Sequence, residues 1–130
     1  MDINITQFDE NCILYIVGEI DLYNAYRLKD AVNAILEKKA CPFIFNLRRV
    51  TYIDSSGIGA LLSINATLAK KGIPFRIVDV PPYVWKVMEL TRLVSFLPVE
   101  PAIKGVSDMR EKHRKILAQK TRASSLPKEA

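Results

Sequence analysis

Two adjacent serines, Ser55 and Ser56, are the residues whose type and position could do chemistry. They follow Asp54 and precede Gly57 at a point where a helix is expected to begin. A serine hydroxyl becomes a nucleophile when a neighbouring general base takes its proton. The only histidine, His113, lies far along the chain in a basic tail, and the serines lack the Gly-x-Ser-x-Gly setting of hydrolases. We therefore expect no catalytic residue and no enzymatic activity.

Nucleotide and metal chemistry have less support still. Gly57 and Gly59 form a Gly-x-Gly pair, but the sequence lacks the longer glycine patterns that cradle nucleotide phosphates. Two acids, Glu19 and Asp21, follow an apolar run and could lie near Asp54 in space. Acids beside loops are usually solvated or cap a helix. We therefore expect no metal ion and no cofactor.

Cysteine usage and the N-terminus predict a cytoplasmic protein. Cys12 and Cys41 are far apart in the sequence and lack a Cys-x-x-Cys pattern or a neighbouring histidine, so we interpret both as small hydrophobes. The first ten residues lack the basic and apolar parts of a secretory signal. No apolar run approaches the roughly 18 to 20 residues of a membrane span, so no membrane association is expected.

The formal net charge of +5 is concentrated at one end of the chain. Residues 1–100 hold 11 Lys or Arg and 11 Asp or Glu, whereas residues 101–130 hold eight and three. A nucleic-acid-binding fold carries a basic face on its structured body, with aromatic platforms or a recognition helix beside it. The sequence indicates neither, and we expect no nucleic-acid partner.

Hydrophobic periodicity and turn residues predict an α/β fold. The elements follow the order β-β-α-β-α-β-α-β, which implies a mixed sheet with a parallel portion packed against helices. The expected strands cover roughly 3–8, 12–17, 43–47, 75–80 and 96–99, and the expected helices roughly 21–39, 54–72 and 82–91. The helix after Asp54 is the best marked, because Asp-Ser-Ser-Gly precedes it and Lys-Lys-Gly ends it.

Residues 101–130 are expected to be a basic C-terminal tail. One helical face would carry Val106, Met109, His113, Ile116 and Leu117. We expect an extra amphipathic helix there, solvated or weakly docked, and a disordered end from Thr121; a dedicated interaction arm is the alternative. The core-forming pattern is complete by Val99, so residues 1–100 should form the folded domain.

Two motifs are similar to those of a known family. Gly18-Glu19-Ile20-Asp21 follows one strand, and Tyr52-Ile53-Asp54-Ser55-Ser56-Gly57-Ile58-Gly59 follows another. Residues 3–100 resemble the STAS domain of bacterial anti-sigma factor antagonists. The resemblance implies a non-enzymatic domain that binds an anti-sigma factor, itself a serine kinase of the GHKL type. It also implies that Ser55 accepts phosphate, that phosphorylation releases the antagonist, and that a metal-dependent serine phosphatase restores it.

The expected helix start gives these residues physical roles. Backbone N–H groups and the positive end of the helix dipole would favour an added phosphate on Ser55. Ser56 is interpreted as a helix cap, whereas Asp54 either caps the helix or orients Ser55. Gly57 and Gly59 are expected to allow close packing of the helix on a strand rather than to touch a ligand.

Further candidate contacts lie around this helix start. Ile58 belongs to the matched motif and is assigned to shaping the site. Glu19 and Asp21 match the acidic loop of the family and either contact the partner or give the site its polarity; a solvated loop with Asp21 capping the first helix is the alternative. Tyr83 could anchor an interface, whereas Trp85 is expected in the core.

Two classes of function stay open at this point, besides a catalytic hydrolase on Ser55, which the lack of a general base already weakens. The first is a phosphorylation-switched binding module that acts on an anti-sigma factor kinase. The second is a non-enzymatic scaffold subunit of a larger signalling or lipid-transport assembly, in which STAS domains also occur and a phosphoserine is not always used. The complete Asp54-Ser55-Ser56-Gly57 sequence favours the first. We expect a monomer or a weak dimer.

Overall fold

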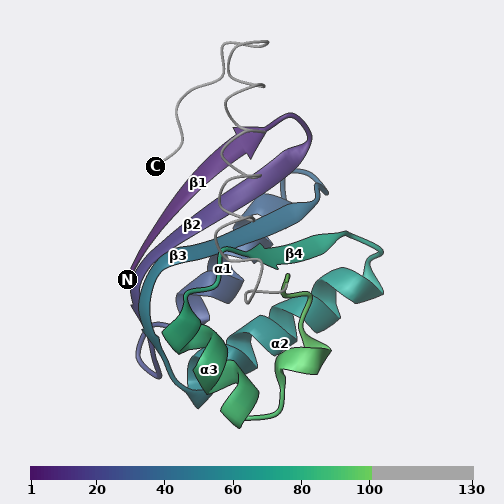
Figure 1. Cartoon of the computed structure of the whole chain (residues 1–130). Coiled ribbons are helices and arrows are strands. Elements are labelled where there is room, and N and C mark those ends of the chain that lie inside the picture. Colours follow the sequence, from purple (N-terminus) through teal and green to yellow (C-terminus); the bar gives the residue numbers. More distant parts are fainter. Residues whose placement is uncertain (101–130) are drawn as a thin grey trace.

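Residues 1–100, the part that the computed structural model describes, form a four-stranded sheet with helices packed on one side (Figure 1). The strands are β1 (Asp2–Phe8), β2 (Asn11–Ile20), β3 (Phe43–Ile53) and β4 (Phe75–Val78). The helices are α1 (Tyr26–Leu36), α2 (Ser55–Lys70) and α3 (Pro82–Leu90). β1 pairs antiparallel with β2, while β2, β3 and β4 run parallel in that order. The predicted α/β class and mixed sheet are confirmed.

The hydrophobic core lies between the sheet and the helices. Because side chains alternate along a strand, Leu14, Phe45 and Ile77 occupy paired positions on β2, β3 and β4 and face the helices. All three are fully buried, and the Phe45 ring meets the Phe75 ring edge-on with 5.0 Å between centroids. At the C-terminal ends of β2 and β3, where the candidate site is built, the buried Ile20 and Ile53 belong to the same core.

Several element boundaries differ from those expected, two of them by five residues or more. α1 begins at Tyr26 rather than near residue 21, because residues 21–24 form a turn held by their own polar side chains. β3 continues to Ile53 because its later residues pair with the end of β2. In the described part of the chain, no helix is long and apolar enough to cross a bilayer.

The expected final strand at 96–99 is wrong. A 3₁₀ turn, η1, occupies Val94–Phe96, and Val99 forms an isolated bridge with Ile77 of β4. Pro98 has no N–H to donate to a ladder, which disfavours a regular strand, although its carbonyl accepts the Ile77 N–H at 3.0 Å. This segment closes the outer edge of β4. The predicted tail helix and disordered end, at 101–130, lie outside the described residues.

Cys12 and Cys41 come together in the core although they are far apart in the sequence. Both are buried free thiols that pack in the main core, as their interpretation as small hydrophobes predicts. Burial, and next the neighbouring Cys41, raises the pKa of the Cys12 thiol from 9.0 to about 11. Cys12 therefore stays protonated at neutral pH.

Stability is expected to fall as the pH rises from 9.0 to about 11. In this window Cys12 ionises in the unfolded chain but keeps its proton in the folded one, so the unfolded state binds fewer protons and gains stability. The contribution is fully present below 9.0. The loss amounts to about 2 to 3 kcal/mol at most. Urea titrations of the wild type and of Cys12→Ala below and above the window measure it, and an unchanged difference between the two proteins would contradict it.

Candidate functional site

Asp54 joins α2 to the ends of β2 and β3. Its backbone is extended, with φ at −114°, and its N–H donates to the Ile20 carbonyl at 3.2 Å. Its Oδ1 accepts the N–H groups of Ser56 at 2.9 Å and of Gly57 at 3.1 Å. A carboxylate there also suits the positive end of the helix dipole. Asp54 is thus the N-cap of α2 and fixes where the helix leaves the sheet.

The two serines occupy the first turn of α2 in different surroundings. Ser55 is the first helical residue and is exposed, whereas Ser56 is half-buried. The cap predicted for Ser56 is wrong, because the side chain that reaches the first N–H groups belongs to the extended residue before the helix. Capping is confirmed for Asp54. Two of the N–H groups expected to favour a phosphate are therefore already bonded to a carboxylate.

The acidic loop, residues 19–24, is closed by its own hydrogen bonds. Asp21 Oδ1 accepts the N–H groups of Tyr23 at 2.9 Å and of Asn24 at 3.2 Å. Asn24 returns the contact, since its Oδ1 accepts the Asp21 N–H at 2.9 Å and its Nδ2 donates to the Glu19 carbonyl at 2.9 Å. Asp21 and Asn24 therefore hold the loop in one shape.

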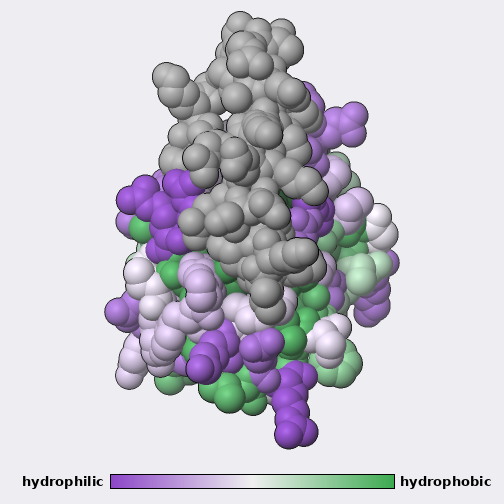
Figure 2. All heavy atoms as spheres, in the orientation of Figure 1, coloured by the Kyte–Doolittle hydropathy of each residue, from purple (hydrophilic) through white to green (hydrophobic). Residues whose placement is uncertain are grey.

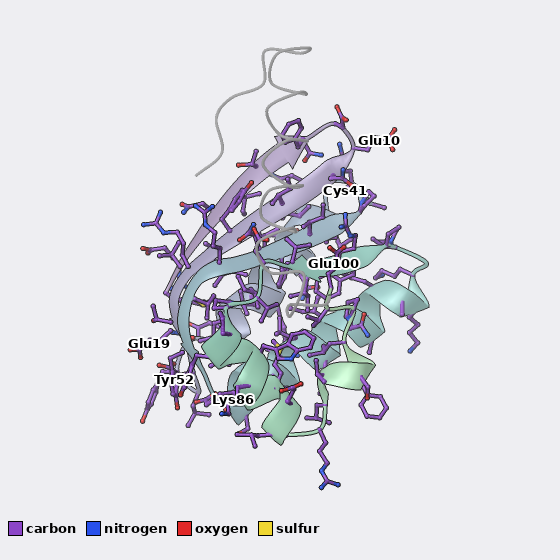
Figure 3. All side chains as sticks on the ribbon, viewed as in Figure 1. Glu10, Glu19, Cys41, Tyr52, Lys86 and Glu100 are labelled. Carbon is purple, nitrogen blue, oxygen red and sulfur yellow. The ribbon has the colours of Figure 1, made fainter. Side chains whose placement is uncertain are left out.

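A hydrogen bond ties the acidic loop to the start of α2: the Leu22 N–H donates to Asp54 Oδ2 at 3.3 Å. Asp21 is thereby brought near the helix start, and it caps the turn before α1 rather than α1 itself, whose N-cap residue makes no side-chain hydrogen bond. Glu19 is exposed and pairs in register with Tyr52 of β3, at one end of the sheet (Figure 3). Within residues 1–100, no three His, Cys, Asp or Glu side chains gather as a metal site would require.

Gly18 sets the direction in which β2 enters this loop. Its φ of 101° lies in the region that favours glycine, and the pairing of β2 with β3 shifts register between Gly18 and Glu19. Beyond the shift, Glu19 is exposed and Ile20 is buried. The Gly-Glu-Ile-Asp motif thus presents an acid outward while anchoring the strand end.

The two glycines of α2 have different roles. A Cβ on Gly57 would lie 2.7 Å from Ile53 Cγ1 and 2.8 Å from Ile20 Cγ2, closer than real Cβ contacts. Gly57 therefore allows α2 to pack on the ends of β2 and β3, as predicted. The same prediction is wrong for Gly59, which is exposed and would place a Cβ in open space. Ile58 is fully buried in the main core, so its expected part in the site stays a prediction.

Exposed apolar side chains lie on the acidic loop and on the helix and strand next to it, and no motif in the sequence marked them. Leu22, Tyr23 and Tyr26 are 67, 84 and 60 % exposed, and Tyr52 is 38 % exposed. We name these four residues the apolar rim. Large apolar side chains gathered at a surface mark interaction sites. The sequence held one signal for them: Leu22, Tyr23 and Tyr26 lie outside the apolar positions that form the buried face of the first helix.

α3 carries two aromatic residues in different surroundings. Trp85 is half-buried and packs against the core, as expected. Tyr83 is exposed, as is Leu90 at the end of the helix. Figure 2 shows apolar residues among polar ones on the lower part of the molecule, where Figure 1 places α3. Tyr83 therefore stays a candidate contact residue.

Replacing Asp54 with alanine is expected to lower the free energy of unfolding by about 1 to 2 kcal/mol, since α2 loses its cap. The loop also loses the Leu22 hydrogen bond. Asp54→Asn keeps one side-chain oxygen for the N–H groups of Ser56 and Gly57 and loses only the acceptor for the Leu22 N–H. It should cost less than about 1 kcal/mol, because asparagine caps about as well as aspartate. Urea denaturation of both variants tests this, and equal losses would contradict a role based on cap geometry.

The fold and this helix start define a small α/β domain, and the sequence identifies its family. Residues 2–106 match the STAS domain family. The chain belongs to the STAS domain family. Among curated relatives, it is 24% identical over 88 residues to the anti-sigma F factor antagonist of Paenibacillus polymyxa, covering 67% of this chain and 75% of that protein.

Solved structures agree with this fold. The anti-sigma factor antagonist SpoIIAA in its unphosphorylated form superposes with a TM-score of 0.63 at 19% identity, covering 85% of this chain and 97% of that chain. The phosphorylated form of the Bacillus cell fate determinant SpoIIAA superposes with a TM-score of 0.58 at 18% identity, covering 82% and 98%. At these identities the likeness establishes the architecture shared with both forms.

Proposed function

We propose that this protein is an anti-sigma factor antagonist whose binding is switched by phosphorylation of Ser55. In its unphosphorylated form it binds an anti-sigma factor that is also a serine kinase of the GHKL type. Phosphate transferred to Ser55 releases it, and a metal-dependent serine phosphatase restores it. The protein itself catalyses no reaction. The observation that carries the proposal is an exposed serine at the first helical position, between a capping carboxylate and a structured loop.

Three features around Ser55 support a docking surface. The hydroxyl is accessible, as a kinase substrate requires. The acidic loop is held by its own hydrogen bonds, so a partner would meet a surface that needs little ordering on binding. The apolar rim supplies Tyr side chains, which dominate many interfaces because they bury a large area.

The charges near Ser55 support a switch. The Asp54 carboxylate lies directly before it and already occupies two N–H groups of the helix start. A phosphate adds about −1.5 to −2 charges at pH 7 and would face this carboxylate rather than free donors. An interface that excludes water at this point would then enclose like charges, which opposes binding.

The test is to incubate the full chain with ATP and each GHKL kinase encoded beside it, and to locate any phosphate by mass spectrometry. We expect one phosphate on Ser55, none in Ser55→Ala, and unchanged phosphorylation of Ser56→Ala. Ser56 is the matched control because it is the adjacent hydroxyl and is half-buried. Phosphate on Ser55→Ala would refute the assignment. Kinase binding without phosphorylation of any residue would favour the scaffold function instead.

A further inference from the structure

A second, smaller apolar cluster lies on the face of the sheet opposite the helices. Phe8, Ile13, Ile44 and Val78 are between 2% and 8% exposed, and the half-buried Tyr15 packs against them. These residues, which we name the open-face cluster, lie on all four strands, and on β2, β3 and β4 they alternate with residues that face the helices. Within residues 1–100 no helical residue belongs to it. Such low exposure on a face without a described helix requires a covering segment.

The described chain ends at the edge of this face. The Glu100 N–H donates to the Ile77 carbonyl of β4 at 3.1 Å, and the Glu100 carboxylate forms an ion pair with Arg76. Arg76 and Val78 flank Ile77 on β4, so both point to the face opposite the helices. Figure 3 shows Glu100 beside this strand. The residues after Glu100 therefore start next to the open-face cluster.

The sequence after Glu100 has the pattern that such a cover needs. Its apolar stripe consists of Val106, Met109, His113, Ile116 and Leu117. As a helix, residues 106–117 would extend about 18 Å. This length is comparable with the width of a sheet of four strands spaced by about 4.8 Å. One helix would therefore reach across the open-face cluster.

Charge favours the same pairing. Next to Val78, Asp79 is 2% exposed, and its Oδ2 accepts a hydrogen bond from Nδ2 of the buried Asn46 at 3.1 Å. A buried carboxylate is best accommodated where donors and opposite charges accompany it. Residues 101–130 hold eight Lys or Arg against three Asp or Glu. The acids Asp79 and Glu100 of this face would therefore meet a segment with an excess of cations, while Arg76 on the same face is already paired with Glu100.

We infer that residues 101–130 of the same chain dock on the open-face cluster, with the stripe from Val106 to Leu117 packed against Ile13, Ile44 and Val78. The tail then forms a third layer of the molecule, on the side of the sheet away from α1, α2 and α3. The Ser55 site lies at the carboxyl ends of β2 and β3 and belongs to the helical side, so docking of the tail does not depend on the proposed switch.

The test is methyl NMR of the full chain with labelled Ile, Leu, Val and Met. We expect nuclear Overhauser cross-peaks between the methyl groups of Val106 or Ile116 and those of Ile13, Ile44 or Val78. Leu117→Glu should remove these cross-peaks and shift the methyl signals of the open-face cluster. Ala118→Glu introduces the same charge on the opposite side of the stripe and should keep them. The methyl signals of Ile64, which faces the main core from α2, should not shift in either variant.

The outcomes separate the possible occupants of the face. A sample that mixes differently labelled chains distinguishes contacts within one chain from contacts between two. Cross-peaks only between chains would mean that a second copy covers the face, and would overturn the inference. The absence of cross-peaks in the wild type would overturn it as well, as would their loss in Ala118→Glu but not in Leu117→Glu. Because the wild-type cross-peaks come first, a variant that folds poorly does not remove the test.

Discussion

Phosphate on Ser55 is expected to weaken binding to the partner kinase by roughly two to three and a half decades. An uncompensated charge buried at an interface costs on the order of 3 to 5 kcal/mol, and about 1.4 kcal/mol corresponds to a tenfold change in affinity. Asp54 adds to this cost, because its carboxylate is fixed beside Ser55 by the N–H groups of Ser56, Gly57 and Leu22. It cannot turn away without uncapping α2.

Ser55→Ala and Ser55→Asp should separate in the same experiment. Alanine removes only a hydroxyl that caps nothing, so this variant should bind as tightly as the unphosphorylated wild type and stay active permanently. Aspartate carries one charge on a shorter side chain, so its affinity should fall between those of alanine and phosphoserine. Isothermal titration of each form into the cognate kinase with nucleotide present gives the three affinities. Equal values would refute an electrostatic switch.

Folding of the Ser55 forms serves as the control. The N-cap is Asp54 rather than either serine, so none of the three changes removes the hydrogen bonds that hold the start of α2. Circular dichroism spectra of the alanine, aspartate and phosphorylated forms should therefore nearly coincide. A loss of helix signal in the phosphorylated form alone would mean that release occurs through melting of α2.

Gly57→Ala and Gly59→Ala are expected to change stability in opposite directions. A Cβ on Gly57 would press against Ile53 and Ile20 at 2.7 and 2.8 Å, and both contact atoms belong to stiff β-branched side chains. Overpacking of this kind costs typically about 1 to 3 kcal/mol. A Cβ on Gly59 meets nothing within 4 Å, so alanine there gains about 0.5 to 1 kcal/mol from helix propensity.

Thermal unfolding of the two glycine variants provides the measurement. A free-energy change of 1 kcal/mol shifts the midpoint by roughly 4 to 8 °C in a domain of this size, so the two midpoints should lie about 6 °C or more apart. The substitutions are chemically identical and two positions apart in one helix, so each controls for the other. A destabilised Gly59→Ala would contradict the open space around that residue.

Much of the fold could be predicted because local patterns and packing agree. The helix start at Asp54 could be recognised in the sequence. An acid at this position can cap a helix, and the glycine three residues later lets the helix approach a strand. The prediction of a final strand was wrong because Pro98 interrupts an apolar stretch that otherwise has the composition of a strand. Which polar residue caps could not be decided from types alone, because Asp54 and Ser56 both cap well. Backbone geometry decides between them.

The site could be predicted only in part, because half of it comes from a distant segment. The motif from Asp54 to Gly57 identified one side, but the apolar rim depends on how residues 19–24 fold back. The hydrogen bond between Leu22 and Asp54 spans 32 positions and has no local signal. Likewise, residue type alone does not predict whether a tyrosine such as Tyr23 is buried or exposed.

Because β2 and β3 are parallel neighbours, residues 19–24 and the start of α2 leave the sheet at the same edge. Most of the core lies away from this edge, between the sheet and the helices. Under the proposed function, replacing the acidic loop could therefore change which partner is bound while the sheet and helices stay the same. A grafted loop would have to retain Asp21 and Asn24, which close it, and place a backbone N–H where Leu22 meets Asp54. The exposed Leu22 and Tyr23 side chains would be free to vary. Under the proposed function, that short segment would decide which anti-sigma factor the protein recognises.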